Sequence, residues 1–188
     1  FNSNSLNLVG PLLDSSLTPS EPIVYVDGGA NFRKTELGFS VGDGDSTVKT
    51  MDERLPEEKN YSDFAYVLSK IPKTITNIKA YGFLGERRDH ELINLLETHR
   101  FLKKRESSTT FLFDNEVMAF SKGSFNLRIE QQFSLVAFEP IKLELQGSVK
   151  YPVVSSGAFE ELSSNGLSNH GFGDITLKTD SSVFLLFG

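Results

Sequence analysis

The stretch Val41-Gly42-Asp43-Gly44-Asp45-Ser46-Thr47 sets two carboxylates one residue apart in a glycine-flanked turn that follows a short strand-like run. The stretch contains no basic residue, so keeping the two like charges together has an electrostatic cost. A divalent cation would offset this cost, because Mg²⁺ takes oxygen ligands and is commonly held by one or two carboxylates together with substrate phosphates. Gly, Asp and Ser are also the ordinary residues of turns. Taken alone, the stretch is better explained as a solvated acidic turn, and its interpretation depends on the rest of the chain.

The composition limits the classes of protein to which the chain can belong. With 188 residues, 38% of them hydrophobic and 23% charged, it can form one large domain or two small ones with a core. The net charge of -6 argues against nucleic acid as the main partner, and no apolar run approaches the roughly 18 residues of a membrane span. The absence of cysteine excludes disulfides, zinc–thiolate sites and cysteine nucleophiles, and it fits the cytoplasm, where we expect the protein.

Strand-like and helix-like stretches alternate in the first part of the chain. Residues 23–26 are β-branched and aromatic and end in the turn Asp27-Gly28-Gly29, which indicates a buried strand. Ser62 is expected to cap a helix that ends before Pro72. The alternation predicts a mostly parallel sheet with helices on its faces. The expected strands are 6–9, 23–26, 39–41, 75–81 and 110–113, the expected helices are 30–37, 63–71 and 89–104, and residues 47–60 are expected to form a loop.

The pattern changes after Asp114-Asn115, where no helical period is found. Short strand-like runs separated by Gly, Ser, Asn and Pro are typical of an antiparallel sandwich or barrel. The sequence therefore predicts an α/β fold followed by an all-β fold, with a nucleotide- and metal-binding domain over residues 1–116 and a β-sandwich over residues 117–188. The expected strands of the second domain are 117–120, 125–129, 133–138, 141–145, 175–177 and 183–187.

Several aspartates fall where strands or glycine turns end. Ligands of open α/β sheets bind outside the carboxyl ends of the strands, so Asp27, Asp43 and Asp45 should project toward one site. Asp63 and Asp89 begin predicted helices on the same side, although a carboxylate there also complements the helix dipole. Asp89 adjoins Arg87, Arg88 and His90. This group is either a surface ion pair of little energetic weight or an arginine that holds a phosphate beside an orienting carboxylate.

Other motifs fail on spacing. An EF-hand that starts at Asp43 would need Gly at position 48 and Glu at position 54, where the chain has Val48 and Arg54. No Walker A sequence is present, and a dinucleotide loop starting at Gly42 lacks its third glycine. The run 43–47 resembles the nucleophile motif of haloacid-dehalogenase-type phosphatases, but the later acidic pair of that family is not evident. With three histidines and no Gly-x-Ser-x-Gly, a serine hydrolase is not expected.

Five short motifs occur in order along the chain. Gly42-Asp43-Gly44-Asp45-Ser46 resembles a Gly-Asp-aromatic-Asp-Ser pattern with Gly44 in place of Phe, and Gly85-Glu86-Arg87-Arg88-Asp89-His90 resembles Gly-Gly-Arg-x-Asp-His. The others are Asp27-Gly28-Gly29-Ala30-Asn31, Asn60-Tyr61-Ser62-Asp63-Phe64, and Lys150-Tyr151-Pro152 with the later Gly166-Leu167-Ser168-Asn169. Each is weak alone. Together, in this order and over most of the chain, they resemble the thiamine pyrophosphokinase family.

This resemblance implies a fold, an activity and a set of site residues. The implied fold is an α/β nucleotide domain followed by a β-sandwich, and the implied reaction moves a diphosphate from ATP to the hydroxyl of thiamine, releasing AMP. The resemblance implies Mg²⁺ as cofactor, held by Asp43, Asp45 and Asp63. Arg87 would contact phosphate, and Asp89 would orient the substrate or a base. The residues implied in nucleotide binding are Asp27, Gly28, Asn31, Ser62, His90 and Asn94.

The resemblance also implies that Ser168 and Asn169 bind thiamine, in a homodimer whose subunits share their active sites. The simpler explanation of these two residues is a polar turn, because Asn165-Gly166 is a preferred hairpin turn. The expected partners are thiamine and ATP, with neither nucleic acid nor a membrane. Two alternatives stay open, namely a hydroxymethylpterin diphosphokinase and a non-catalytic module that binds nucleotide or thiamine.

Overall fold

The computed structural model describes residues 4–34, 37–47, 49–153 and 158–188. The chain divides into two compact units, an N-terminal unit (Phe1–Thr98) and a C-terminal unit (His99–Gly188). The division falls inside helix α2 (Arg88–Lys103), whereas the sequence suggested a domain boundary near Glu116. Among the described residues, no helix is long and apolar enough to cross a membrane.

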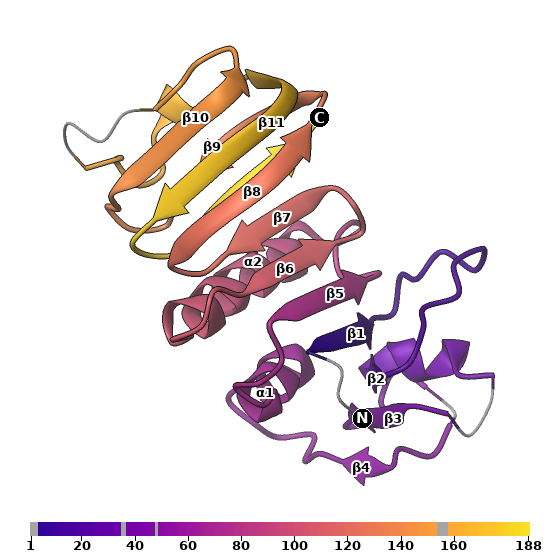
Figure 1. Cartoon of the computed structure of the whole chain (residues 1–188). Helices are drawn as coiled ribbons and strands as arrows, with labels where there is room; N and C mark the ends of the chain where they lie inside the picture. The colour runs from indigo at the N-terminus through magenta and orange to yellow at the C-terminus, as the bar shows by residue number, and fades with distance from the viewer. Residues whose placement is uncertain (1–3, 35–36, 48, 154–157) are drawn as a thin grey trace. The chain divides into compact units, whose positions relative to one another are not determined.

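The N-terminal unit is built on a parallel sheet (Figure 1). Its strands lie in the order β5-β1-β2-β3-β4 and all of these neighbours pair in parallel, as the alternation of strands and helices predicted. The two-residue strand β4 lies in the segment that the sequence suggested as a loop. The strands are β1 (Ser5–Val9), β2 (Ile23–Val26), β3 (Phe39–Gly42), β4 (Glu53–Arg54) and β5 (Asn77–Tyr81).

The order of strands reverses at β1, which pairs with β2 on one side and with β5 on the other. Ligands of open α/β sheets bind outside the carboxyl ends of the strands at such a point. Here the segments after β1 and β5 are joined, because the Leu12 N–H donates to the Gly82 carbonyl at 3.1 Å. Gly82 has a φ of 71°, and a Cβ on it would lie 2.2 Å from the Leu13 nitrogen, so only glycine fits.

The two α-helices start and end as the sequence predicted, to within a residue or two. Helix α1 (Asp63–Lys70) is capped by Ser62, whose hydroxyl accepts a hydrogen bond from the Ala65 N–H at 3.1 Å. Helix α2 has acidic residues in its first turn and basic residues in its last, which suits the helix dipole. The apolar side chains that α1 buries are Phe64, Val67 and Leu68.

The segment after β2 differs from the prediction of an α-helix over residues 30–37, which is wrong for the residues described. A 3₁₀ helix, η1 (Asp27–Phe32), follows β2 directly, and residues 33, 34 and 37 are not helical. Residues 35 and 36 lie outside the described residues. The segment also packs closely against β1, since a Cβ on Gly29 would lie only 2.1 Å from the Val9 carbonyl oxygen. The tighter 3₁₀ turn is a common short connector at such a point.

The C-terminal unit consists of antiparallel strands. One sheet has the order β6-β7-β12-β9 and the other has the order β8-β11-β10. The strand β11 is longer than the predicted 175–177, and a 3₁₀ turn, η2 (Ser164–Gly166), precedes it. The strands are β6 (Thr110–Phe113), β7 (Val117–Phe120), β8 (Gly123–Ile129), β9 (Gln132–Val136), β10 (Leu143–Val149), β11 (Asn169–Thr179) and β12 (Val183–Phe187).

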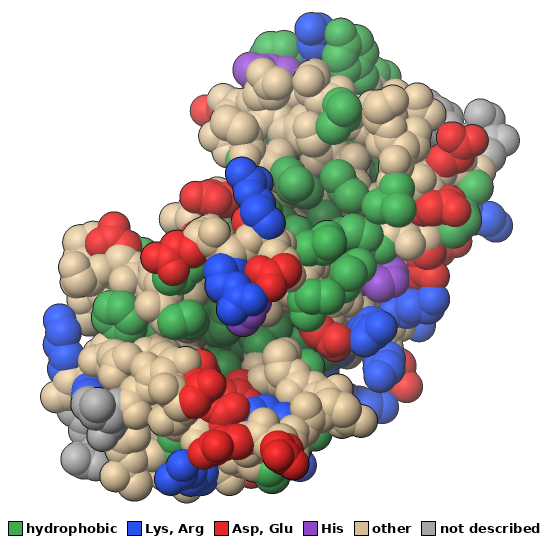
Figure 2. Space-filling view, turned by 180° about the vertical axis from the view of Figure 1, so that it is seen from behind, with side chains coloured by type: hydrophobic (Ala, Val, Ile, Leu, Met, Phe, Trp, Pro, Cys, Tyr) green, Lys and Arg blue, Asp and Glu red, His purple; other side chains and the backbone are tan. Residues whose placement is uncertain are grey.

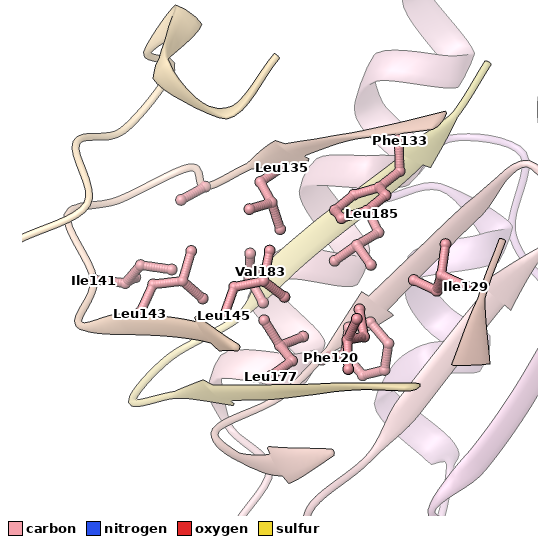
Figure 3. Packing of buried hydrophobic residues seen from close by; sticks show 12 residues of the cluster. Phe120, Ile129, Phe133, Leu135, Ile141, Leu143, Leu145, Leu177, Val183 and Leu185 are labelled. Atoms are coloured by element: carbon pink, nitrogen blue, oxygen red, sulfur yellow. The ribbon is translucent and has the colours of Figure 1, made fainter. Parts of the chain in front are cut away.

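The core of the C-terminal unit draws on both sheets. Figure 3 shows Leu135 of β9 and Leu185 of β12 facing Leu145 of β10 and Leu177 of β11, and all four are at most 1% exposed. Strand β11 joins the sheets, because Asn169 and His170 pair with β9 while its later residues pair with β8 and β10. The antiparallel character was predicted, and the finer description as a β-sandwich stays a prediction.

Candidate active site

A cavity of about 460 Å³ opens beside the carboxyl ends of the parallel strands, entirely within the N-terminal unit. Its walls come from the segments that follow β1, β2, β3 and β5 and from the beginnings of α1 and α2. This is the position expected for a ligand site in an open α/β sheet. The charged residues that line the cavity include Asp27, Asp43, Asp45, Lys59, Asp63 and Arg87.

Three aspartates meet in this cavity. One carboxylate oxygen from each of Asp27, Asp43 and Asp45 can be chosen so that all three lie within 4.8 Å of one another. In Figure 2, acidic side chains gather on the lower part of the face shown, with basic side chains among them. Three converging carboxylates are a hard-oxygen set that suits Mg²⁺. The sequence predicted the Asp43/Asp45 pair, and the structure adds Asp27, which the sequence had assigned to nucleotide.

Asp27 combines an unfavourable backbone conformation with a buried carboxylate oxygen that has no hydrogen-bond partner among the described residues. Its φ is 47°, in the left-handed region that non-glycine residues rarely adopt. Its Oδ1 atom is buried and has no hydrogen-bond partner among the described residues. Burial raises the pKa of this carboxyl, the charges of Asp45 and Asp63 raise it further, and hydrogen bonds from Gly28 and Ser46 act in the opposite direction. The unpaired buried oxygen is a group that a bound cation would satisfy.

The acidic cluster has an internal cation that the sequence did not reveal. The Lys59 ammonium forms an ion pair with Asp43 Oδ2, lies 2.9 Å from Asp63 Oδ1, and donates to the Pro56 carbonyl at 3.0 Å. Its side chain is 8% exposed. The hydrogen bond from Lys59 lowers the pKa of Asp43. The turn has no counter-charge of its own in sequence, but the fold brings one to it from 16 residues away.

Asp63 contacts Lys59 and the turn rather than the three-carboxylate group. Its Oδ2 accepts the Asp43 N–H at 3.2 Å, and its Oδ1 has Lys59 as ion-pair partner without a well-aligned hydrogen bond. The side chain is 9% exposed. These contacts fix the position of the Asp43 backbone. Direct binding of a metal by Asp63 stays a prediction.

The Arg87 and Asp89 side chains form a two-pronged pair at the cavity rim. Arg87 Nε and Nη2 donate to the two carboxylate oxygens of Asp89 at 3.2 and 2.6 Å. Both side chains are about two-thirds exposed, at 65% and 63%. The bonds from Arg87 lower the pKa of Asp89, and Asp89 raises that of Arg87. Arg87 and His90 line the cavity.

Among the remaining residues predicted to bind nucleotide, Asn31 and Asn94 form hydrogen bonds that connect separate segments of the site. The Asn31 amide donates to the Ser46 carbonyl at 3.1 Å, while its oxygen accepts the Thr47 hydroxyl at 2.6 Å, so η1 is joined to the acidic turn. The Asn94 amide donates to the Phe83 carbonyl at 2.9 Å, which holds α2 to the segment after β5. Ser62 caps α1, Gly28 is buried in η1, and Ser62 and Asn94 also line the cavity.

The two residues predicted to bind thiamine lie in the C-terminal unit. Asn169 is 3% exposed, and its amide exchanges hydrogen bonds with the backbone of Tyr151, accepting at 3.0 Å and donating at 2.8 Å. Ser168 is exposed, with a φ of 57°, and its N–H donates to the Ser134 hydroxyl at 3.2 Å. Asn169 therefore holds the chain around Tyr151, and Ser168 is the exposed residue of the two.

Lys59 is the residue of the candidate site that the sequence did not predict. Its only local signal is the spacing of four residues to Asp63, an arrangement common among surface ion pairs and too weak to single it out. Tyr61 and Phe83, which also line the cavity, were not recognised either. These contacts depend on how the segment between β3 and α1 crosses the turn, and neither pattern nor spacing encodes that path.

Comparison with known proteins identifies the fold. No family model and no curated protein matches the sequence. A thiamine pyrophosphokinase from Bacillus subtilis matches with a TM-score of 0.72 at 18% identity, over 97% of this chain and 98% of that chain. A thiamin pyrophosphokinase from Candida albicans matches with a TM-score of 0.71 at 14% identity, over 98% and 89%. One from Geobacillus thermodenitrificans gives 0.70 at 16% identity, over 98% and 97%.

These structures define the chain first as a protein with a parallel α/β unit followed by an antiparallel unit. More particularly, the chain has the fold of the thiamine pyrophosphokinases over nearly its whole length. The resemblance that the sequence motifs predicted is therefore confirmed at the level of the fold. The identities, all below 21%, show no more than that.

Proposed function

We propose that this chain is a thiamine pyrophosphokinase, which transfers a diphosphate from ATP to the hydroxyl of thiamine and yields thiamine diphosphate and AMP. The observation that supports this most is the group Asp27, Asp43 and Asp45 at the carboxyl ends of β2 and β3, in a chain with the fold of these enzymes. The thiamine hydroxyl oxygen bonds to the β-phosphorus and its proton passes to solvent, while the bond from that phosphorus to the α–β bridging oxygen breaks and AMP leaves with this oxygen. Phosphoryl transfer of this kind depends mainly on positioning and charge neutralisation.

The proposed metal ligands are Asp27, Asp43 and Asp45. The donor set fits Mg²⁺, because all three groups supply oxygen and Asp27 Oδ1 has no partner among the described residues. When bound, Mg²⁺ supplies neutralisation of the charge that builds on the phosphate oxygens. The protein keeps the ligands in place through Asp63, which accepts the Asp43 N–H, and through Asn31, which is bonded to the acidic turn. We retain Asp63 as a candidate ligand only if Lys59 moves away from it.

Arg87 is the proposed contact to phosphate. Its guanidinium is exposed at the cavity rim and is already oriented by the two bonds to Asp89. We expect Arg87→Ala to weaken ATP binding roughly tenfold to a hundredfold, as for the loss of a charge-assisted hydrogen bond. Arg88→Ala is the matched control, since Arg88 is its exposed neighbour and is not among the cavity residues. Calorimetric titration with ATP measures both, and equal affinities for the two variants would contradict the assignment.

Ser168 is the proposed contact to the acceptor, with Asn169 shaping the turn that presents it. The exposed ring of Phe172, whose centroid is 4.6 Å from that of the His170 ring, offers an aromatic surface close in sequence to Ser168.

We also propose, as the sequence suggested, a homodimer in which the subunits share their active sites. Sedimentation of an active monomer would rule this out. The proposed localisation is the cytoplasm.

A single assay tests the function. The protein is incubated with ATP, Mg²⁺ and either thiamine or a hydroxymethylpterin, and AMP and the diphosphorylated product are measured. We expect both products with thiamine and neither with thiamine in EDTA. Product from the pterin alone would identify the hydroxymethylpterin enzyme instead. Tight ATP binding without AMP from either acceptor would identify a non-catalytic module.

A further inference from the structure

The Lys59 ammonium is enclosed by three oxygens, from Asp43, Asp63 and Pro56. Of its three N–H donors, one hydrogen bonds to Asp43 Oδ2 and one to the Pro56 carbonyl, while Asp63 Oδ1 lies 2.9 Å away as an ion-pair partner. Lys59 lines the cavity, but its charge is already paired with two carboxylates and its side chain is only 8% exposed. The effect of Lys59 on the site therefore acts through the two carboxylates that it contacts, Asp43 and Asp63.

Both oxygens of Asp43 are in use in this arrangement. Oδ2 pairs with Lys59, and Oδ1 accepts the Asp45 N–H at 3.2 Å. A divalent cation held by Asp27, Asp43 and Asp45 would share Asp43 with a positive charge that is only 8% exposed. Two like charges that meet at one partly buried carboxylate repel strongly, because the surroundings screen them poorly.

We propose that Lys59 is an internal counter-cation, which neutralises Asp43 and Asp63 in the metal-free protein and has to release Asp43 when a divalent ion binds. Lys59 is thus a positioning residue that lowers the affinity for metal alone. It also keeps the acidic turn folded before the metal arrives. This inference rests on the proposed function only for the choice of Mg²⁺ as the natural ion.

The test is binding of Mn²⁺ alone, without nucleotide or thiamine, to Lys59→Met and to the unchanged protein. Electron paramagnetic resonance measures free Mn²⁺ directly. We expect Lys59→Met to bind Mn²⁺ at least about tenfold more tightly, because a nearby positive charge is gone and Asp43 Oδ2 is released. Lys59→Arg, which keeps the charge, should bind it nearly as the unchanged protein does.

The matched control is Lys49→Met. Lys49 lies in the same region, but its ammonium donates to the backbone carbonyls of Asn31 and Arg33 rather than to a carboxylate of the cluster. Its removal changes the net charge of the protein equally and should leave Mn²⁺ affinity within about twofold. An equal gain in both Met variants would overturn the proposal, since the effect would then be one of net charge.

Thermal unfolding provides a second readout. In EDTA, Lys59→Met should melt at a lower temperature than the unchanged protein, because its carboxylates repel one another. Addition of Mn²⁺ should then raise its melting temperature by more than it raises that of the unchanged protein. If the variant is unfolded in EDTA, Mn²⁺ should restore its fold. Unchanged or weaker Mn²⁺ binding, or failure of Mn²⁺ to restore the fold, would overturn the proposal.

These outcomes are independent of catalysis. A protein that fails to make thiamine diphosphate but shows the Mn²⁺ shift would contradict the proposed function and support the role of Lys59. A protein that makes thiamine diphosphate, but whose Lys59→Met variant does not bind Mn²⁺ more tightly, would support the proposed function and contradict the role of Lys59.

Discussion

Asp43→Asn is expected to lower the rate of diphosphate transfer by on the order of 10²-fold or more, the scale for removing one charge that stabilises a transition state. Asp43 is the residue at which the three-carboxylate group and Lys59 meet, so no other single carboxylate in the described cavity touches both. The amide has almost the same shape and can still accept the Asp45 N–H through its oxygen, but it carries no charge for a cation. Steady-state formation of AMP at saturating ATP and thiamine measures the loss.

The fold of this variant should persist. Lys59 would keep Asp63 at 2.9 Å and the Pro56 carbonyl at 3.0 Å as partners. Far-ultraviolet circular dichroism and the melting temperature in EDTA check this. The control is Asp174→Asn, a carboxylate 86% exposed on β11 in the other unit, which should retain full activity. Near-normal turnover by Asp43→Asn in Mg²⁺ would show that the metal assignment is wrong.

The second large effect concerns stability. Gly29→Ala would place a Cβ 2.1 Å from the Val9 carbonyl oxygen and 2.7 Å from its carbon, and both are backbone atoms of β1 that cannot turn aside. Either η1 or the end of β1 has to move, and overpacking of this kind costs about 3 kcal/mol. Because Asp27 begins η1, its carboxylate should be displaced from those of Asp43 and Asp45 as well. Urea unfolding measures the first effect and Mn²⁺ binding the second.

Gly44→Ala separates steric contact from backbone strain. Gly44 has a φ of 81°, and a Cβ on it would meet nothing within 4 Å. Its substitution should therefore cost only about 1 kcal/mol, the penalty of a left-handed backbone. Equal losses of stability in Gly29→Ala and Gly44→Ala would show that the contact with Val9 adds no cost beyond that of the backbone conformation.

Much of the fold was predictable, because hydrophobic runs and caps are local signals. The strand at 23–26 and the helix capped by Ser62 were recognised from residues that lie next to one another. The failures have a common cause in contacts made by distant segments. The η1 segment packs closely against Val9 at Gly29, and β4 consists of Glu53 and Arg54, whose polar character gives no strand signal.

The candidate site shows the same division. Motif order predicted Asp43 and Asp45, and the position after β2 predicted that Asp27 lies near them. Lys59 could not be predicted, because its partner Asp43 is 16 residues away along a segment whose regular structure is limited to the two residues of β4. The burial of Asn169 was missed for a related reason, since the backbone that its amide bonds to, at Tyr151, is 18 residues away. Sequence spacing fixes neither path.

Strand β11 also determines how cooperatively the C-terminal unit unfolds. Its 11 residues supply hydrogen bonds to β8 and β10 along most of their length and to β9 at Asn169 and His170. Neither sheet can open fully while the other keeps this strand. Partial unfolding of one layer is therefore coupled to the other, and the slowest-exchanging amide protons of β9 and β10 should be released in one cooperative event rather than in two.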